Sequence, residues 1–314
     1  MRKELGTFVL LIILCLIVAA INPRFLSPAN LQNMGRLIGM YGIFSIGIGL
    51  VIITGGIDLS VGSILALLGV LLSIMLTQWG WPGALAVGAV ILIAMCLGGL
   101  HGLLVTRLRI QPFIVTLCGL LFYRGLARFI ANDETKGFGS AAGFETLRDL
   151  ATGSLFYLPM PFIILLIISL IMWVVLHRTV YGRYLFAVGR NEEAARYSGI
   201  NSSKIIASSY VLSGTLAGIA GVLIAFYTNS ISPSSHGSFY ELYGIAAAVL
   251  GGCSLRGGEG SIVGILIGAA LLQVLQNLVN LLGIPSSLNF AVMGAVILIG
   301  VIADQLLQRK SVAA

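Results

Sequence analysis

The stretch that decides the fold is LIGMYGIFSIGIGLVIITGGIDLSVGSILALLGVLLSIML, residues 37–76. It contains two apolar blocks, 37–54 and 59–76, each close to the roughly 20 residues that a helix needs to cross the hydrocarbon core of a bilayer. Between them stand two glycines and one carboxylate, Asp58. The stretch therefore predicts two membrane segments joined by a short glycine-rich break.

The composition extends this prediction to the whole chain. Of the 314 residues, 58% are hydrophobic and 9% are charged, whereas roughly a quarter of an ordinary soluble domain is charged. With a mean hydropathy of +1.04, apolar residues must cover the outside as well as the core, which is stable only in lipid. The 40 glycines fit closely packed membrane helices. We expect an all-α, polytopic membrane helical bundle that forms a single domain over residues 1–314.

About ten apolar segments follow one another along the chain. They are 5–21, 37–54, 59–76, 83–105, 113–131, 159–176, 205–228, 240–251, 262–282 and 288–302. The eighth is too short to cross a bilayer alone. Because lipid does not tolerate exposed irregular backbone, we expect this segment to continue as a broken or re-entrant element. The first segment has features of a secretory signal, but the apolar blocks that follow favour a retained span.

The distribution of basic residues predicts the orientation. If the N-terminus faces the cytoplasm, 12 of the 18 basic residues lie inside. They are Arg2, Lys3, Arg107, Arg109, Arg178, Arg183, Arg190, Arg196, Lys204, Arg256, Arg309 and Lys310. This excess predicts that the N- and C-termini are both cytoplasmic, with an even number of spans. Topology also explains the net charge of +7, and since no basic face is formed, we expect no nucleic-acid partner.

Two polar stretches interrupt the apolar pattern. Residues 132–158 form the longest external, periplasmic loop and contain a short amphipathic pattern of Phe144, Leu147 and Leu150. This pattern predicts either a helix lying on the membrane surface or a docking site for an external partner. Residues 177–204 form the longest internal loop.

A two-turn helix is predicted within the internal loop. Asn191 is suited to cap its start, and Glu192 and Glu193 occupy the first turn, where the helix dipole favours anions. Gly199 stands where a helix commonly ends. Ala194 and Ala195 are expected to leave one face smooth, and Ser202 or Ser203 to cap the next span.

Two glycine-rich breaks are candidates for a substrate pathway or gate. GGIDLSVGSILAL at 55–67 and GGCSLRGGEGS at 251–261 both follow even-numbered segments, so we expect them on the same side. Asp58 or Ser60 is expected to cap the following helix, and a carboxylate at membrane depth also suggests a water-lined path. The candidate pathway or gating residues are Gly55, Gly56, Asp58, Ser60, Gly251, Gly252, Ser254 and Asn289.

Four motifs occur in the order in which they occur in a known family. They are GGIDLSVGS at 55–63, IQPFIVTLCGLLFYRG at 110–125, NEEAARYSGI at 191–200 and GGCSLRGGEGS at 251–261. Over nearly its whole length the chain resembles the ribose-type permeases of ABC importers, departing from the pattern at Cys118. The resemblance implies a multi-pass protein of the bacterial inner (cytoplasmic) membrane that translocates a monosaccharide such as ribose, galactose or arabinose.

The resemblance also implies partners. They are membrane lipid, a separate ABC ATPase subunit, a periplasmic sugar-binding protein, the sugar substrate and a second permease chain, either the same or paralogous. In such permeases a short cytoplasmic helix with an EAA-type core followed by Gly sits in a cleft of the ATPase, which makes 177–204 the coupling loop. The implied ATPase-coupling residues are Asn191, Glu192, Glu193, Ala194, Ala195, Ser198 and Gly199.

The alternative is an ion-coupled secondary transporter or a channel for a small polar solute. Its candidate residues are Asp58, His101, Arg124, Arg128, Glu241 and Asp304. The chain has no Walker motif and no catalytic cluster at suitable spacing, so we expect it to be no enzyme. Its cysteines and histidines lack ligand spacing, so we expect neither a metal site nor a cofactor. Polar residues suited to line a path or to join helices are Asn229, Ser230, Asn277, Asn280 and Asn289.

Overall fold

The computed structural model describes residues 2–139, 141, 144–285, 288, 291, 294, 295 and 298. The long helices are α1 (Arg2–Ile21), α2 (Pro28–Ile53), α3 (Val61–Thr77), α4 (Gly83–Arg107), α5 (Pro112–Ala131), α7 (Met160–Arg178), α10 (Ser202–Thr228) and α12 (Ile262–Leu281). The shorter ones are the 3₁₀ helix η1 (Pro23–Leu26), α6 (Phe144–Thr152), α8 (Val180–Arg190), α9 (Glu192–Tyr197) and α11 (Tyr240–Leu250). The strands form two antiparallel pairs, β1 (Lys136–Gly137) with β4 (Ser230–Ile231), and β2 (Ser154–Leu155) with β3 (Leu158–Pro159).

The described residues form an all-α polytopic membrane bundle, as predicted. Seven of their helices are long and apolar enough to cross a membrane, and α3 and α11 are shorter apolar helices. These nine correspond to the first nine predicted segments, while the tenth, 288–302, lies mostly outside the described residues. The start of α2 differs from the prediction. It begins at Pro28, where the Ser27 side chain accepts a hydrogen bond from the backbone N–H of Asn30, and its first turns are polar.

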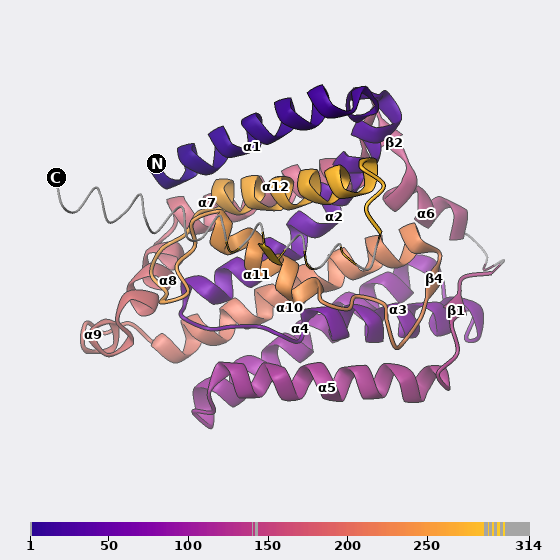
Figure 1. Cartoon of the computed structure of the whole chain (residues 1–314). Coiled ribbons are helices and arrows are strands. Elements are labelled where there is room, and N and C mark those ends of the chain that lie inside the picture. The colour runs from indigo at the N-terminus through magenta and orange to yellow at the C-terminus, as the bar shows by residue number, and fades with distance from the viewer. Residues whose placement is uncertain are drawn as a thin grey trace.

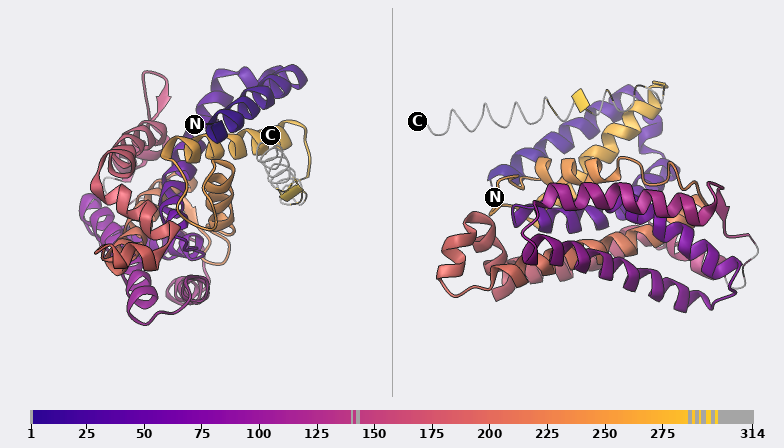
Figure 2. Two further views of the ribbon diagram at one scale, coloured as in Figure 1. Left: turned by 90° about the vertical axis from the view of Figure 1, so that its left-hand side faces the viewer. Right: turned by 90° about the horizontal axis from the view of Figure 1, so that it is seen from below.

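Three helices form the centre of the bundle. α2, α3 and α10 are mostly buried, and α10 packs on both α2 and α3; α4 and α5 lie on one side, and α7, α11 and α12 on others (Figures 1 and 2). The outer helices α1, α4, α5 and α7 expose large apolar side chains such as Leu16, Leu92, Phe122 and Leu170. Water would penalise so much exposed apolar surface, so these faces are suited to lipid.

Glycines allow α4 and α10 to touch through their backbones. Gly98 and Gly102 of α4 face Tyr210 and Ala207 of α10, and a Cβ at Gly98 would overlap the carbonyl of Tyr210. On the other helix, a Cβ at Gly214 would overlap the carbonyl of Ala94. Small residues four apart on facing helices are the arrangement that membrane helices use to pack closely.

The bundle has two distinct ends (Figure 1). We call the end with α8 and α9 the α9 end, and the end with α6, β1, β2 and β4 the α6 end. The start of α1 lies at the α9 end, where Ser261 donates a hydrogen bond to Glu4. At the α6 end, Phe144 of α6 stacks on Phe138 at 4.8 Å between ring centroids. The apolar side of α6 therefore packs on the protein itself, and of its three predicted apolar residues only Leu150 is exposed.

Candidate functional site

Helix α9 has the start and the end that the sequence predicted. The Asn191 side chain accepts a hydrogen bond of 2.9 Å from the N–H of Ala194. At the other end Gly199 has a φ of +83°. Its N–H bonds to Arg196, and the N–H of Ile200 bonds to Ala195, both at 3.0 Å. This pair of bonds is the Schellman arrangement, in which a glycine accepts the left-handed conformation without strain.

The exposed surface of α9 is narrower than predicted. Ala195 is buried by the chain itself, with 5% of its surface exposed. Glu193, Ala194 and Tyr197 are exposed, Tyr197 to 83%. Of the two alanines, only Ala194 therefore offers a surface to another protein.

Hydrogen bonds fix α9 to the start of α10. Ser202 donates a hydrogen bond of 3.0 Å to the carboxylate of Glu192. The side chain that caps α10 is Asn201, which accepts from the N–H of Lys204 at 3.0 Å, so the prediction of a cap from Ser202 or Ser203 is wrong. Ser202 instead links the two helices, which holds α9 against the bundle.

The glycine-rich loop 251–261 packs between α8 and the end of α2. The N–H of Gly258 donates to the carbonyl of Ile53 at 2.8 Å. A Cβ at Gly189 of α8 would overlap the same carbonyl, and one at Gly257 would lie 2.5 Å from the carbonyl oxygen of Gly189 and 3.0 Å from the nitrogen of Gly55. Both breaks thus lie on the same side, as predicted, and they meet beside the end of α8.

The other predicted residues of this loop shape its turn. Gly251 packs directly on Gly264 of α12, and Gly252 has a φ of +93°. The N–H of Ser254 bonds to the carbonyl of Glu259 at 3.1 Å. A role of these residues in a pathway or gate stays a prediction, and Asn289 lies outside the described residues.

Asp58 is buried at the junction of the first break with α3. Only 1% of it is exposed. One carboxylate oxygen accepts hydrogen bonds from the N–H (3.0 Å) and hydroxyl (2.6 Å) of Ser60, and the other accepts from Ser213 of α10 at 3.0 Å. Neither Asp58 nor Ser60 makes a side-chain cap on α3, so that prediction is wrong. Asp58 instead ties the break to α10. Neighbouring Gly56 is buried against the Tyr210 hydroxyl.

A polar chain extends from Asp58 across the bundle. The Ser60 hydroxyl lies 3.5 Å from Nδ1 of His101 on α4, and the hydroxyl of Tyr123 on α5 lies 2.9 Å from its Nε2. Asp58 bonds to serines and not to His101, so the order differs from that of a Ser–His–Asp nucleophile. No sequence pattern indicates Tyr123 or Ser213, because these contacts join residues far apart in the chain.

Comparisons with known proteins give the family. Residues 30–301 match the sequence profile described as the permease component of the branched-chain amino acid transport system. The chain belongs to this family.

The relatives of this permease are subunits of import systems. It is 40% identical over 304 residues to the ribose import permease protein RbsC of Bacillus subtilis, covering 96% of this chain and 93% of that protein. It is 38% identical to the RbsC of Haemophilus influenzae, covering 98% and 94%. It is 33% identical to the autoinducer 2 import system permease protein LsrD of Photorhabdus laumondii, covering 95% and 90%. No solved structure matches the chain significantly.

The permease is therefore a multi-pass inner-membrane transporter subunit and not an enzyme. Most of its described ionisable candidates for ion coupling are bonded to other groups of the chain, as shown above for Asp58 and His101. Arg124 donates to backbone carbonyls ahead of α11, and Arg128 pairs with Asp133. The hydrogen bond from Arg128 and its charge hold the pKa of Asp133 below its usual value. Glu241 is buried in the first turn of α11, and Asp304 lies outside the described residues.

Of the polar residues that were predicted to line a path or join helices, one joins two helices, and a path-lining role of the others stays a prediction. Asn277 exchanges two hydrogen bonds, of 3.1 and 2.7 Å, with Asn30 of α2 and so joins helices. Asn229 ends α10 in the left-handed conformation, with a φ of +55°. Ser230 and Asn280 are exposed.

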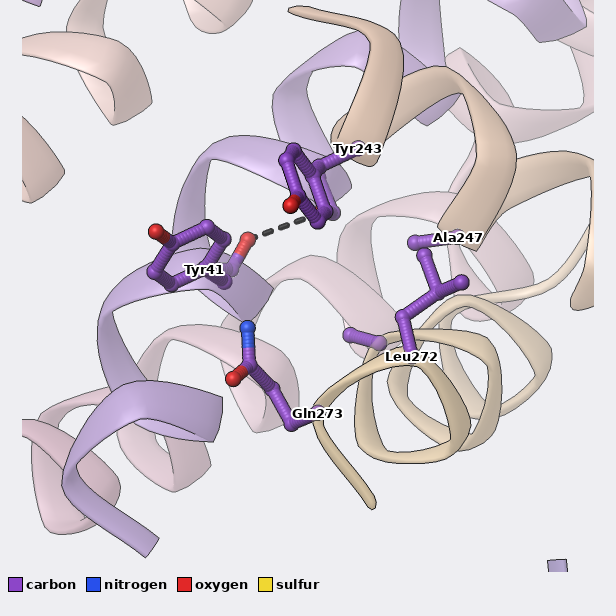
Figure 3. Close-up of a pocket in the computed structure, with 7 residues that line it drawn as sticks. Tyr41, Tyr243, Ala247, Leu272 and Gln273 are labelled. Atoms are coloured by element: carbon purple, nitrogen blue, oxygen red, sulfur yellow. Dashed lines mark hydrogen bonds between the residues drawn. The ribbon is translucent and has the colours of Figure 1, made fainter. Parts of the chain in front are cut away.

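A narrow hollow lies between α2, α11 and α12 of the permease (Figure 3). It is lined by Tyr41, Ser45, Tyr243, Ala247, Ala269, Leu272 and Gln273. The Ser45 hydroxyl donates to the backbone of Tyr41 at 2.7 Å, so part of its polar lining is already bonded. None of the described residues predicted for the pathway borders this hollow.

Proposed function

We propose that the chain moves a monosaccharide of the ribose type through the membrane for an ABC importer. The observation that carries this proposal is the likeness to ribose import permeases, 38–40% identical over 93–94% of their length. Likeness to the autoinducer 2 permeases is lower, at 32–34%. A sugar carries no charge, and a passage for it needs hydroxyl and amide groups, not an ion-coupling carboxylate.

The ATPase is proposed to bind at the α9 end. The chain itself lacks a Walker motif, so the hydrolysing subunit is another protein. α9 is fixed at both ends and exposes Glu193, Ala194 and Tyr197. Held against the bundle by Glu192 and Ser202, this short helix presents a rigid surface to a partner. A periplasmic binding protein would deliver the sugar to the α6 end, and a second permease chain, identical or paralogous, would complete the pathway.

The α9 end is proposed to be cytoplasmic. Several of the basic residues that the predicted topology places inside lie at this end. Among them are Arg107, which ends α4 beyond its contact with α10, and Arg190, which lies beside the 251–261 loop. With a tenth span over 288–302, both termini are cytoplasmic. Reporter fusions within 178–204 and after Lys310 should give cytoplasmic signals, and fusions within 132–158 periplasmic ones. A periplasmic signal from 178–204 would overturn the orientation and the ATPase site together.

Uptake by proteoliposomes tests the substrate. The permease is reconstituted with the ATPase and binding protein encoded beside it, and radiolabelled ribose, arabinose, xylose, galactose and autoinducer 2 are compared. We expect ATP-dependent ribose uptake that is lost when the ATPase is omitted. Uptake of autoinducer 2 alone, or uptake that follows an ion gradient without ATP, would refute the proposal.

A further inference from the structure

The segment before α11 makes part of a membrane crossing without being helical. α11 has 11 residues, which extend about 16 Å at the helical rise of 1.5 Å per residue. The hydrocarbon core is roughly 30 Å thick. The remaining depth on the way from the α6 end to the α9 end has to be covered by residues 229–239, of which only Ser230 and Ile231 are in a strand.

Contacts with α3 show how far this segment enters the bundle. A Cβ at Gly69 would lie 3.1 Å from Ile231, and a Cβ at Gly62 would overlap the carbonyl of Gly237. Between Gly69 and Gly62 the segment therefore follows α3 over seven residues, about 10 Å along the helix axis. It reaches the first turn of α3, where α11 begins.

Arg124 of α5 holds the segment in place. Its guanidinium donates to the carbonyl of Pro233 at 3.0 Å and to the carbonyl of His236 at 2.7 Å. These bonds satisfy backbone groups that a helix would otherwise satisfy internally. The left-handed φ values of Gly237 (+68°) and Phe239 (+67°) then turn the chain into α11.

The side chains of the segment are unusually polar for this depth. Ser232 and Ser234 have their hydroxyls 3.3 Å apart, and Ser234 and Ser235 are exposed. His236 is buried, and its Nε2 has no hydrogen-bond partner among the described residues. Half of Phe239 is exposed. Lipid does not accept irregular backbone with exposed hydroxyls, so this face has to meet water or protein.

We propose that the segment 232–239 lines the water-filled passage and binds the sugar in transit. The Ser234 and Ser235 hydroxyls exchange hydrogen bonds with the hydroxyls of the sugar, and the exposed ring of Phe239 covers its apolar C–H face. An uncharged polyhydroxylated ligand suits this surface, since its hydroxyls donate and accept as serines do. This inference rests on the proposed function and identifies where in the chain selectivity among sugars arises.

Cysteine labelling tests whether the segment faces water. Ser234→Cys and Ser235→Cys are placed in a variant without the native cysteines and treated in membranes with a positively charged methanethiosulfonate. Leu170→Cys is the matched control, because Leu170 is 65% exposed on the apolar surface of α7. We expect the serine positions to react at least tenfold faster than Leu170→Cys. Equal reaction rates overturn the proposal. It is also overturned if both cysteines are protected from the reagent and cross-link two permease chains, because the segment would then be a subunit interface.

Sugar selectivity tests binding. Loss of one hydrogen bond corresponds to an effect of about 3- to 10-fold, so Ser234→Ala or Ser235→Ala should lower ribose uptake by that factor. Uptake of a deoxyribose that lacks the bonded hydroxyl should fall less than uptake of ribose. The ratio of ribose uptake to deoxyribose uptake should therefore decrease. Unchanged preference in both variants, with normal amounts of protein, overturns the proposal. If the unaltered importer takes up no sugar, the proposed function fails, whereas the labelling rates still report whether the segment faces water.

Discussion

Replacement of Asp58 tests the polar junction between the first break, α3 and α10. Asp58→Ala removes the acceptor of three hydrogen bonds, two from Ser60 and one from Ser213. At a site where 1% of the residue is exposed, water does not readily replace the carboxylate. The donors that remain are left in a buried environment, which is the costly outcome for polar groups.

The expected loss of stability is worked out from two values per bond. Polar contacts between membrane helices average about 0.6 kcal/mol each, and hydrogen bonds to charged groups contribute at least about 1.5 kcal/mol. For three bonds, Asp58→Ala should therefore lower the free energy of unfolding by about 2 kcal/mol with the first value and by about 4.5 kcal/mol or more with the second. Asp58→Asn keeps one acceptor oxygen, and Ser213→Ala removes one of the three bonds, so each should lower the free energy of unfolding by less than Asp58→Ala does.

The assay compares the Tm of the purified permease variants in detergent with their uptake in proteoliposomes. The Tm should fall most in Asp58→Ala and less in Asp58→Asn and Ser213→Ala. A Tm of Asp58→Ala equal to that of the unaltered protein would refute the structural role of the carboxylate. Uptake by Asp58→Asn tests whether the charge of Asp58 also acts in transport. If it falls further than the Tm explains, the charge acts in the pathway, and normal uptake leaves the charge without a function in transport.

Three further predictions concern α9 and the helix contacts. Ala194→Arg changes an exposed position and should abolish co-purification of the ATPase at a normal yield of permease, whereas Ala195→Arg, at a buried position, should lower the yield of permease. Normal ATPase binding by Ala194→Arg would contradict the proposed coupling surface. Gly199→Val places a Cβ at a φ of +83°, which costs about 1–2 kcal/mol and should disturb the end of α9. Sugar-stimulated ATP hydrolysis should therefore fall although the subunit inserts normally, and unchanged hydrolysis would show that the turn tolerates the strain. Gly98→Val, whose Cβ would overlap Tyr210, should prevent folding, whereas the neighbouring Gly99→Val, with its nearest atom at 3.8 Å, should fold; equal yields would mean that the α4–α10 contact is loose.

Local signals made some features predictable from the sequence and long-range contacts hid others. α9 was predictable because its cap and its glycine stop lie within nine residues, 191–199. The polar first turns of α2 hid its start at Pro28, since hydropathy registers only apolar length. The hydrogen bonds between Ser213 and Asp58 and between Tyr123 and His101 join different elements of the bundle. No spacing in the sequence reports such bonds, because only the packing of α3, α4, α5 and α10 brings these residues together.

The segment 229–239 was missed for a similar reason. Because the block 240–251 is short, the sequence predicts that it continues as a broken or re-entrant element, without indicating on which side of the block. The structure shows a regular helix there and places the irregular part before it, in a serine-rich stretch that contains one apolar residue in a strand, Ile231. Composition alone makes such a stretch look like an ordinary loop, because its contacts with Gly62 and Gly69 come from a helix more than 160 residues earlier.

The contact of Gly189, Gly257 and Ile53 determines how movement passes through the α9 end. Where side chains separate two helices, a change of rotamer can accommodate a small shift of one helix without moving the other. Here the backbones of α8, the 251–261 loop and α2 touch with no side chain between them. We therefore expect a displacement of α9 to reach the end of α2 through α8, five residues before Asp58 in the chain. An added methyl group at Gly189 would overlap the Ile53 carbonyl and push these backbones apart, so we expect it to weaken this coupling.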